Sequence, residues 1–454
     1  MLRWALGLVP ATVGGGWTTV RWLGERERRR HEEELGPEDG WEVEGGRVLK
    51  GGPTEEIEDP EAEAARLAQE AAWYSFAGDS SASTFTKLAL DTFPSSAPAR
   101  LVRACWYMQK DAWKVVREDL SAPALRDTPE ARLLLEFTER LPRSPDWRHA
   151  FFDAWKALGQ PDFRKSTVLP APIEWNRMNS TMLTQVHPGE DWLFPVGIVS
   201  PGTMAGKEPW MRERVLGCQS IPLLMAMREQ LLSLEEAAPM RQACFAAVEE
   251  RLGQLAGPAP RTLQLALIPF LSGTSYSAPF ERRELEALEK LVALREWKQP
   301  SNEEVFREMQ GHMDVVYGPA HHAWMMTSLA QATSHGTWLL DRARASKAHL
   351  SEDELRWLGR LLYEVGARLR AQPSRLELEM GLRLQMSGSE LMQHVPTREE
   401  CIAAWIQLGN WEDAVKKAAY DRWPIARLRE ESCEHRARNE LAWMQAFAGT
   451  GELP

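Results

Sequence analysis

Beyond residue 60, apolar residues recur every three to four positions along the chain, the spacing that is typical of amphipathic helices. The first such run covers residues 61–76, and a polar break at 78–81 separates it from a second run at 82–93. Further runs follow at 97–108, 111–120, 130–140 and 146–158. Because short polar breaks join neighbouring runs, the pattern predicts helices that fold back on one another as hairpins.

The second half of the chain shows longer apolar runs. They cover residues 213–234, 237–255, 260–271, 281–297, 302–316, 320–347 and 351–371. The last run begins with Ser351 and Glu354, the pair expected of a capping box. Two shorter runs, 397–409 and 411–420, predict a final hairpin. Since several of these runs are longer than repeat helices, we expect an irregular helical bundle here.

Three stretches resemble the tetratricopeptide repeat family. The pattern A-L-x-x-x-P-x-x-A-x-A-R-L covers Ala89 to Leu101, and its Ala-Arg-Leu end returns at Ala131, within a shortened copy at 124–133. That step of 32 residues is close to the family's period of roughly 34. Residues 404–415 (AWIQLGNWEDAV) are similar to the family's turn between helices. The resemblance covers roughly a quarter of the chain and implies stacked helical hairpins with a concave surface that binds a peptide or protein.

Prolines interrupt the helical pattern between residues 161 and 217 and exclude a long helix there. They are Pro170, Pro172, Pro188, Pro195, Pro201 and Pro209. The apolar run 192–199 within this insertion could form a short strand or an exposed anchor. Long loops are often functional, but the sequence favours a structural cover over the end of the first helical stack.

These boundaries give an all-α fold class: stacked helical hairpins (TPR-like) followed by an irregular helical bundle, with a Pro-rich insertion. The expected division has five parts. They are an N-terminal arm with an acidic, glycine-rich linker (1–60), the hairpins (61–160), the insertion (161–217), the bundle (218–396) and a C-terminal hairpin (397–454). Strand is expected only as short pieces near residues 16–48 and in the insertion.

The N-terminal arm has an amphipathic character that leaves two interpretations open. Residues 4–20 carry no charge, but Pro10 and three glycines make them a poor membrane-spanning helix, and an A-x-A-like cleavage site is absent. Tryptophans at 4, 17 and 22 followed by arginines would suit an interfacial anchor. We expect either a soluble arm or membrane association through residues 4–22. In both cases, deletion of residues 1–55 should leave the melting temperature nearly unchanged.

Charge and cysteine content argue against two classes of protein, those that bind nucleic acid and those held by disulfides or a zinc knuckle. With 54 basic and 65 acidic residues among 454, the formal net charge is -11, so no general field attracts nucleic acid, and we expect no nucleic-acid partner. The five cysteines are far apart and form no C-x-x-C motif. This favours reduced thiols over disulfides or a zinc knuckle, and hence a cytoplasmic protein. If the N-terminal arm binds a membrane, the protein is peripheral to that membrane or anchored in it.

One cluster has metal-ligand character. Glu304, Glu308 and His312 follow one another at four-residue spacing on a predicted helix, and carboxylates and imidazoles so placed can reach a common ion. The same spacing is also common on solvated helix faces. No H-E-x-x-H, G-x-S-x-G or P-loop motif occurs, so the sequence predicts no catalytic residue and no cofactor.

The sequence therefore favours an interaction or scaffold protein that presents a helical-repeat groove to a protein or peptide partner. The alternative is an enzyme of unknown type, with a site near the Glu304/Glu308/His312 helix or in the Pro-rich loop. A deep pocket lined by convergent polar groups would favour the enzyme, whereas an open face would favour the scaffold. The oligomeric state does not follow from the sequence.

Overall fold

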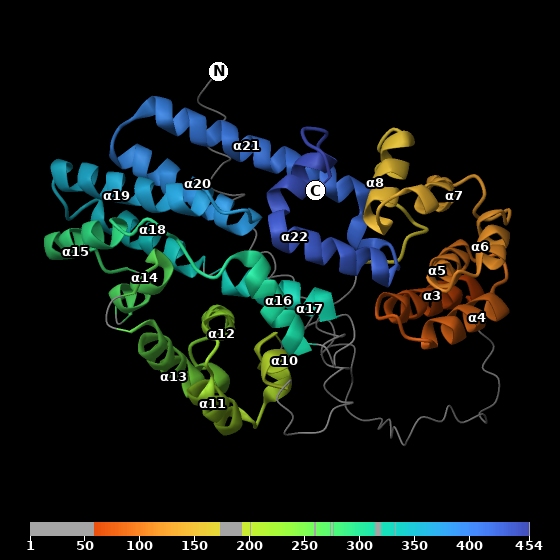
Figure 1. Ribbon diagram of the computed structural model, residues 1–454, viewed down its shortest axis with the longest axis horizontal. Helices are drawn as coiled ribbons and strands as arrows, with labels where there is room; N and C mark the ends of the chain where they lie inside the picture. Colours follow the sequence, from red (N-terminus) through yellow and green to blue (C-terminus); the bar gives the residue numbers. More distant parts are fainter. Residues whose placement is uncertain are drawn as a thin grey trace. The chain divides into compact units, whose positions relative to one another are not determined.

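A computed structural model describes residues 59–172, 193–199, 201–257, 260–272, 274–275, 277–313, 319–331 and 333–453. Every regular element within these ranges is a helix (Figure 1), which confirms the all-α fold class. Residues 58–454 form one compact unit. The predictions for the N-terminal arm, its linker and the strands near 16–48 fall outside the described residues.

The first described helices pack on their neighbours, as the hairpin pattern predicts. They are α3 (Pro60–Phe76), α4 (Ser81–Thr92), α5 (Ala97–Met108), α6 (Trp113–Leu120), α7 (Pro129–Arg140), the 3-10 turn η1 (Leu141–Arg143) and α8 (Trp147–Ala157). Helix α3 contacts α4 and α5, α5 contacts α6, and α7 contacts α8. Ser96 and Thr128 cap α5 and α7, and a proline follows each cap in the first turn, where it is tolerated.

The start of the Pro-rich insertion is held by one arginine. Arg422 donates hydrogen bonds to backbone carbonyls along residues 163–170, at distances of 2.7 Å to Leu169 and 2.8 Å to Pro170. Phe163 and Leu169 are buried in the same core as the first hairpins. Residues 161–172 therefore pack as a structural cover, whereas residues 173–192 lie outside the described part of the chain.

The apolar run at 192–199 is neither a strand nor an exposed anchor, so both interpretations of it are wrong. Residues Leu193–Val199 form helix α10, and Phe194 and Ile198 are buried in a core shared with α12 and α17. Pro195 lies in the first turn, where a missing N–H breaks no intrahelical bond. The short turn η2 (Pro201–Met204) and helix α11 (Glu208–Gly217) follow, so helices resume earlier than the pattern indicates.

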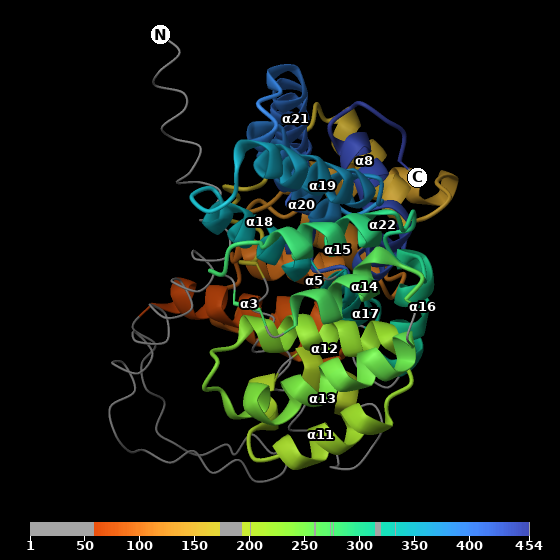
Figure 2. The ribbon, with the colours of Figure 1, turned by 90° about the vertical axis from the view of Figure 1, so that its left-hand side faces the viewer.

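The bundle contains shorter helices than predicted. Its first part consists of α12 (Ile221–Ser233), α13 (Pro239–Ala256), α14 (Leu263–Leu271), α15 (Arg282–Val292), α16 (Asn302–Met313), α17 (Pro319–Ala330) and α18 (Ser334–Ser346). Figure 2 shows α11 and α12 next to α13, and each of these two helices contacts α13. The run 213–234 is not one helix, because Ser220 caps a new helix and Pro222 occupies its first turn. The run 320–347 likewise divides into α17 and α18.

Helices α19 (Glu352–Arg370) and α20 (Arg375–Leu391) form a close hairpin. The capping box of Ser351 is confirmed, whereas α20 was not predicted. Glycines on each helix lie seven residues apart, and the hairpin brings them together in pairs. A Cβ at Gly366 would lie 2.6 Å from the Gly381 oxygen, and one at Gly388 would lie 2.5 Å from the Gly359 oxygen. Only glycine allows the two backbones to approach this closely.

The predicted break between residues 409 and 411 is wrong. Residues Val395–Ala418 form one continuous helix, α21, which passes through Gly409 without a turn. A glycine inside a helix costs roughly 1 kcal/mol, but Leu408 and Trp411 on either side pack against neighbouring helices, and this burial outweighs that cost. The stretch that resembles a repeat turn is therefore helical. On the outer face of α21, Ile402 and Ile406 remain exposed.

Helix α22 (Ala426–Phe447), which the pattern did not predict, follows the turn η3 (Tyr420–Arg422) and joins two hydrophobic cores. Cys433 and Ala437 belong to the core of α10–α13, α16 and α17. Trp443 and Phe447 belong to the core of α5–α8, α20 and α21. A third core lies among α14, α15 and α18–α20. The first hairpins and the bundle are thus packed onto the same C-terminal helix.

Candidate functional site

Helix α16 carries the three side chains that the sequence singled out, and it contributes to two open clefts. Cleft A, of about 990 Å³, lies between the 295–301 segment, Glu304 and the C-terminal part of α19. Cleft B, of about 1060 Å³, lies between α10, α11, the Gly217–Ser220 link, α12 and α16. Glu304 lines cleft A, whereas Glu308 and His312 line cleft B. The structure therefore divides the predicted cluster between two places.

Helix geometry explains the division. Four residues advance a helix by slightly more than one turn, so each step of four rotates the side chain by about 40° and moves it roughly 6 Å along the axis. From Glu304 to His312 the rotation is about 80° and the rise about 12 Å. The first and last side chains of the cluster consequently face different neighbouring helices.

Glu304 is engaged in capping its own helix. Its carboxylate accepts hydrogen bonds from the Ser301 N–H at 2.8 Å and from the Ser301 hydroxyl at 2.7 Å, while its own N–H donates to that hydroxyl at 3.3 Å. These hydrogen bonds from Ser301 lower the pKa of Glu304. The residue therefore stabilises the start of α16.

The predicted metal site remains a prediction. Within the described ranges, no three His, Cys, Asp or Glu side chains are grouped so that they could hold a metal ion. His321 and His322 lie on α17, with ring centroids 6.0 Å apart. Burial, and next the charge of Arg429, lowers the pKa of His321 well below its usual value. We derive no metal chemistry from these residues.

The charged side chains of cleft A are largely engaged in contacts with the protein itself. Lys298 forms a buried ion pair with Glu377 at 2.6 Å, and Glu377 also accepts hydrogen bonds from Trp297 at 3.1 Å and Ser374 at 2.7 Å. Arg368 donates to backbone carbonyls at the end of α15 and pairs with Glu364. Of the charged side chains that line cleft A, Arg295 alone has no hydrogen bond or ion pair to the described residues.

Cleft B combines an apolar wall with uncommitted polar groups. Phe194 and Leu223 are buried in its wall, and Trp210 stands at its side with the Arg214 guanidinium 5.3 Å from the ring centre. Three polar side chains line the cleft without a hydrogen bond or ion pair to any part of the chain that the structure describes. They are Glu213, Glu308 and His312.

Cys218 also lines cleft B, and its thiol is half-buried. Burial is the main influence that raises its pKa, the carboxylate of Glu308 raises it further, and a hydrogen bond to Ser220 and the charge of Arg251 oppose the rise only in part. Arg251 donates to the Cys218 carbonyl at 2.8 Å. The thiol is therefore protonated at neutral pH and is a weak nucleophile.

The pattern of the sequence identified Glu308 and His312 but missed Trp210, Glu213 and Cys218. These three residues lie on or just after α11, far from α16 along the chain. Periodicity shows which residues share one helix face, but it does not show which helices lie together. The spacing of Trp210 and Glu213 within one helix was the available signal, and it does not distinguish a cleft from an ordinary surface.

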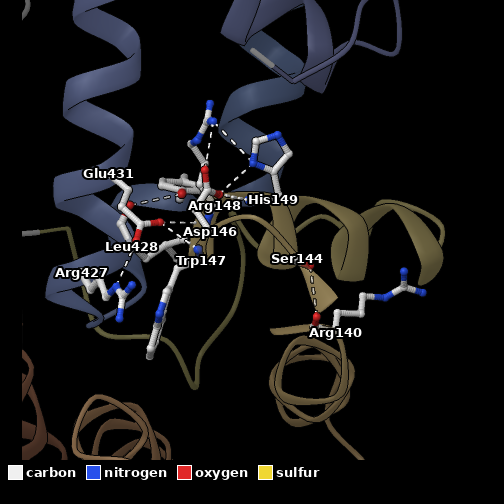
Figure 3. Close-up of polar contacts among 10 residues, drawn as sticks. Arg140, Ser144, Asp146, Trp147, Arg148, His149, Arg427, Leu428 and Glu431 are labelled. Atoms are coloured by element: carbon white, nitrogen blue, oxygen red, sulfur yellow. Dashed lines mark hydrogen bonds and ion pairs between the residues drawn. The ribbon is translucent and has the colours of Figure 1, made fainter. Parts of the chain in front are cut away.

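Figure 3 shows another polar cluster, at the start of α8 where it meets α22. Asp146 caps α8 by accepting from the His149 N–H at 2.7 Å, and its carboxylate lies 2.8 Å from the His149 ring. Burial raises the pKa of Asp146, but the hydrogen bonds from His149 and the charge of Arg148 outweigh this, so the pKa is lowered. Glu431 of α22 accepts from the Trp147 N–H at 2.8 Å.

The polar contacts at this α8–α22 junction hold the two helices together and do not form a catalytic triad. An aspartate–histidine pair is part of some catalytic triads, which also require a hydroxyl or thiol beside the imidazole. The neighbouring Ser144 hydroxyl instead donates to the Arg140 carbonyl at 3.1 Å, away from His149 (Figure 3). The Asp146 and Glu431 carboxylates both accept hydrogen bonds from N–H groups in the first turn of α8. Because Glu431 belongs to α22, its hydrogen bond joins α8 to α22.

Fold and clefts together define an all-helical protein of packed helical pairs, with cleft B as its candidate binding surface. Comparison of the chain with protein-family models, with curated proteins and with solved structures gives no match. None of the helices in the described ranges combines the length and the apolar character that crossing a bilayer requires.

Proposed function

We propose that the protein binds a segment of another protein in cleft B. The observation that carries this proposal is an open cleft of about 1060 Å³ in which an apolar wall adjoins polar side chains that have no partner among the described residues. Aromatic and arginine side chains are the usual anchors of protein interfaces, and Trp210 with Arg214 supplies both. An open cleft suits an extended or helical segment better than a small substrate, which is usually largely enclosed.

The packed helical pairs α3 to α8 support the further proposal that the protein acts as a TPR-like scaffold. In such an arrangement, each helical pair supports the position of the next, and the assembled surface presents binding groups at fixed positions. The partner in this proposal is a protein or peptide, and the acidic net charge of -11 argues against nucleic acid.

One experiment tests the binding proposal directly. A photo-crosslinking amino acid is placed at Gln219, which lines cleft B and is exposed, and in a second sample at Gln372, which lines cleft A. In native extract we expect a reproducible crosslinked protein at position 219 only, and its loss when Trp210→Ala is added. Identical products at both positions, or none at 219, would overturn the proposal.

An enzyme is the second candidate, and one observation favours it: a thiol, an imidazole and a carboxylate line the same cleft. These are Cys218, His312 and Glu308. The raised pKa of Cys218 opposes this role, because catalytic cysteines are activated as thiolates. If Cys218 reacted with iodoacetamide at neutral pH faster than a free thiol, and more slowly after His312→Gln, the enzyme would become the better proposal.

We also propose a cytoplasmic location. The five cysteines are all unpaired in the structure, which supports a reducing compartment. Contact of residues 4–22 with a membrane remains part of this proposal. Deletion of residues 1–55 separates the two forms: if the arm binds a membrane, the protein moves from the membrane fraction to the soluble fraction without a change in melting temperature.

A further inference from the structure

We propose that the segment bound in cleft B is basic, with a lysine or arginine whose charged group pairs with Glu213 and Glu308. This inference rests on the proposed function of cleft B and specifies the chemistry of its partner. Both carboxylates line the cleft, one from α11 and one from α16, so they come from different helices. A cation seated between these helices would have a negative group on each.

The two carboxylates differ from the other acidic groups near α16 because no described residue neutralises them. Glu304 is held by Ser301, and Glu364 is paired with Arg368. Glu213 and Glu308, in contrast, make no ion pair or hydrogen bond to the described residues. Helix α11 carries two cations beside Glu213: Arg212 does not line cleft B, and Arg214 lies over the Trp210 ring and is not free. The uncommitted charge of cleft B is therefore negative.

Glu308 and Cys218 line the same cleft, and both side chains are only partly exposed. The charge of Glu308 contributes to the raised pKa of the Cys218 thiol, which agrees with this placement. A group in this position is partly desolvated. An uncharged segment that filled the cleft would remove more water from Glu308 without replacing it, which is unfavourable.

The apolar wall favours a long cationic side chain over a small cation. Lysine and arginine carry three or four methylene groups before their charge, and these can cover Phe194 and Leu223 while the charged end reaches the carboxylates. An acidic segment would bring like charges together in the cleft. A basic segment with apolar neighbours therefore matches both the wall and the charge of cleft B.

The test uses the full chain and three fluorescent synthetic peptides of about eight residues, which is enough to extend across roughly 26 Å. The peptides share their apolar residues and carry lysine, glutamine or glutamate at the same positions. Fluorescence anisotropy measures binding to the wild type and to the double variant Glu213→Gln/Glu308→Gln, at low and at high salt. We expect only the lysine peptide to bind, and its Kd to rise about tenfold in the double variant.

A matched control removes the same charge elsewhere. Glu399 and Glu400 are exposed on α21 and have no ion pair or hydrogen bond within the described residues, so Glu399→Gln/Glu400→Gln changes the net charge equally. This variant should bind the lysine peptide as the wild type does. Equal weakening in both double variants would mean that the peptide responds only to net charge, and would overturn the inference.

The remaining outcomes separate the inference from the function on which it rests. Equal binding of all three peptides, lost on Trp210→Ala, would overturn the basic partner and leave cleft B as a binding site. No binding of any peptide would also overturn the inference, and the crosslinking at Gln219 would then decide the proposed function by itself. Since Glu213 and Glu308 have no partner to lose among the described residues, an unchanged melting temperature of the double variant confirms that its fold is intact.

Discussion

Cleft A and cleft B have similar volumes and share helix α16, but their polar groups are used differently. In cleft A the carboxylate of Glu304 caps a helix and that of Glu364 pairs with an arginine, while Lys298 of the cleft wall is held by the buried Glu377. In cleft B the carboxylates of Glu213 and Glu308 have no such partners in the described structure. The first cleft is part of how the chain folds, and the second retains polar groups that a partner can bind.

The comparison shows that size alone does not identify a binding site. A side chain that is already paired must break an internal contact before it binds a ligand, so part of the binding free energy is lost. An unpaired carboxylate beside an apolar wall has no internal contact to break. If this difference is correct, substitutions of engaged groups reduce stability, whereas substitutions in cleft B affect binding but not stability.

The largest effect is expected for Glu377→Ala, which removes an engaged group beside cleft A. Glu377 is fully buried and Lys298 is nearly so, and the two are 2.6 Å apart. Removal of one member of a buried pair leaves the other charge without compensation and costs about 3–5 kcal/mol. Calorimetry should show a strongly lowered melting temperature. Glu377→Gln, which keeps one side-chain oxygen as an acceptor, should be milder, and an unchanged melting temperature in Glu377→Ala would contradict the engaged role.

A second substitution disturbs the helix that forms one wall of cleft A. In Gly366→Ala, the added Cβ would lie 2.6 Å from the Gly381 carbonyl oxygen, so α19 and α20 must move apart. Overpacking of this kind costs about 1–3 kcal/mol. Gly409→Ala on α21 is the control, because its Cβ meets nothing within 4 Å, and it should leave stability unchanged or slightly improved. Equal urea midpoints for the two variants would argue against close glycine packing.

A third test compares a half-buried histidine, His435, with His312 of cleft B. Burial, and next the charges of Arg148 and Arg438, lowers the pKa of His435 to about 4. Since the unfolded chain takes up this proton near pH 6.5 and the folded protein only near pH 4, His435 makes the protein less stable as pH falls through that interval. The melting temperature of the wild type should therefore decrease from pH 7.5 to pH 5, and by less in His435→Gln.

His312→Gln is the matched control for this titration. The His312 side chain is exposed and has no hydrogen bond within the part of the chain that the structure describes. The variant should follow the wild type at both pH values. If His312→Gln reduced the pH dependence of the melting temperature and His435→Gln did not, His312 and not His435 would be the histidine whose protonation is coupled to folding.

The smallest effect on stability is expected for substitutions of two residues of helix α16, Glu304 and Glu308. Glu304→Ala removes the capping box with Ser301 and should lower the melting temperature by a small, measurable amount. Glu308→Ala, one turn further along α16, should leave it within error, since the carboxylate has no partner in the described ranges. A larger loss in Glu308→Ala than in Glu304→Ala would show that Glu308 is engaged after all.

Local chemistry predicted the helices that begin with clear caps and failed where tertiary contacts override it. The cap of α19 at Ser351 and the hairpins before residue 160 could be predicted, because capping and periodicity act within a few residues. The turn expected near Gly409 is a helix, since Leu408 and Trp411 are packed by other parts of the chain. Helix α20 was missed, although the equal seven-residue spacing of its glycines and those of α19 was readable in the sequence.

The candidate site was predicted only in part for a related reason. Glu308 and His312 are visible as polar residues of one helix, but Trp210, Glu213 and Cys218 join them only because α11 and the link after it lie beside α16 in cleft B. Glu304, predicted as their companion, faces cleft A. Which polar groups share a cleft depends on helix packing, and which of them are free depends on contacts with residues far along the chain.

The sequence by itself therefore determined the all-α class, the capped helix starts and the acidic charge, because these depend on neighbouring residues or on composition alone. Only the tertiary structure decided that α21 is continuous, that Glu304 and His312 face different clefts, and that Glu377 is engaged while Glu308 is not. The physical reason is that burial and ion pairing are formed between helices far apart in the sequence, and their energies exceed the local preferences that a sequence pattern records.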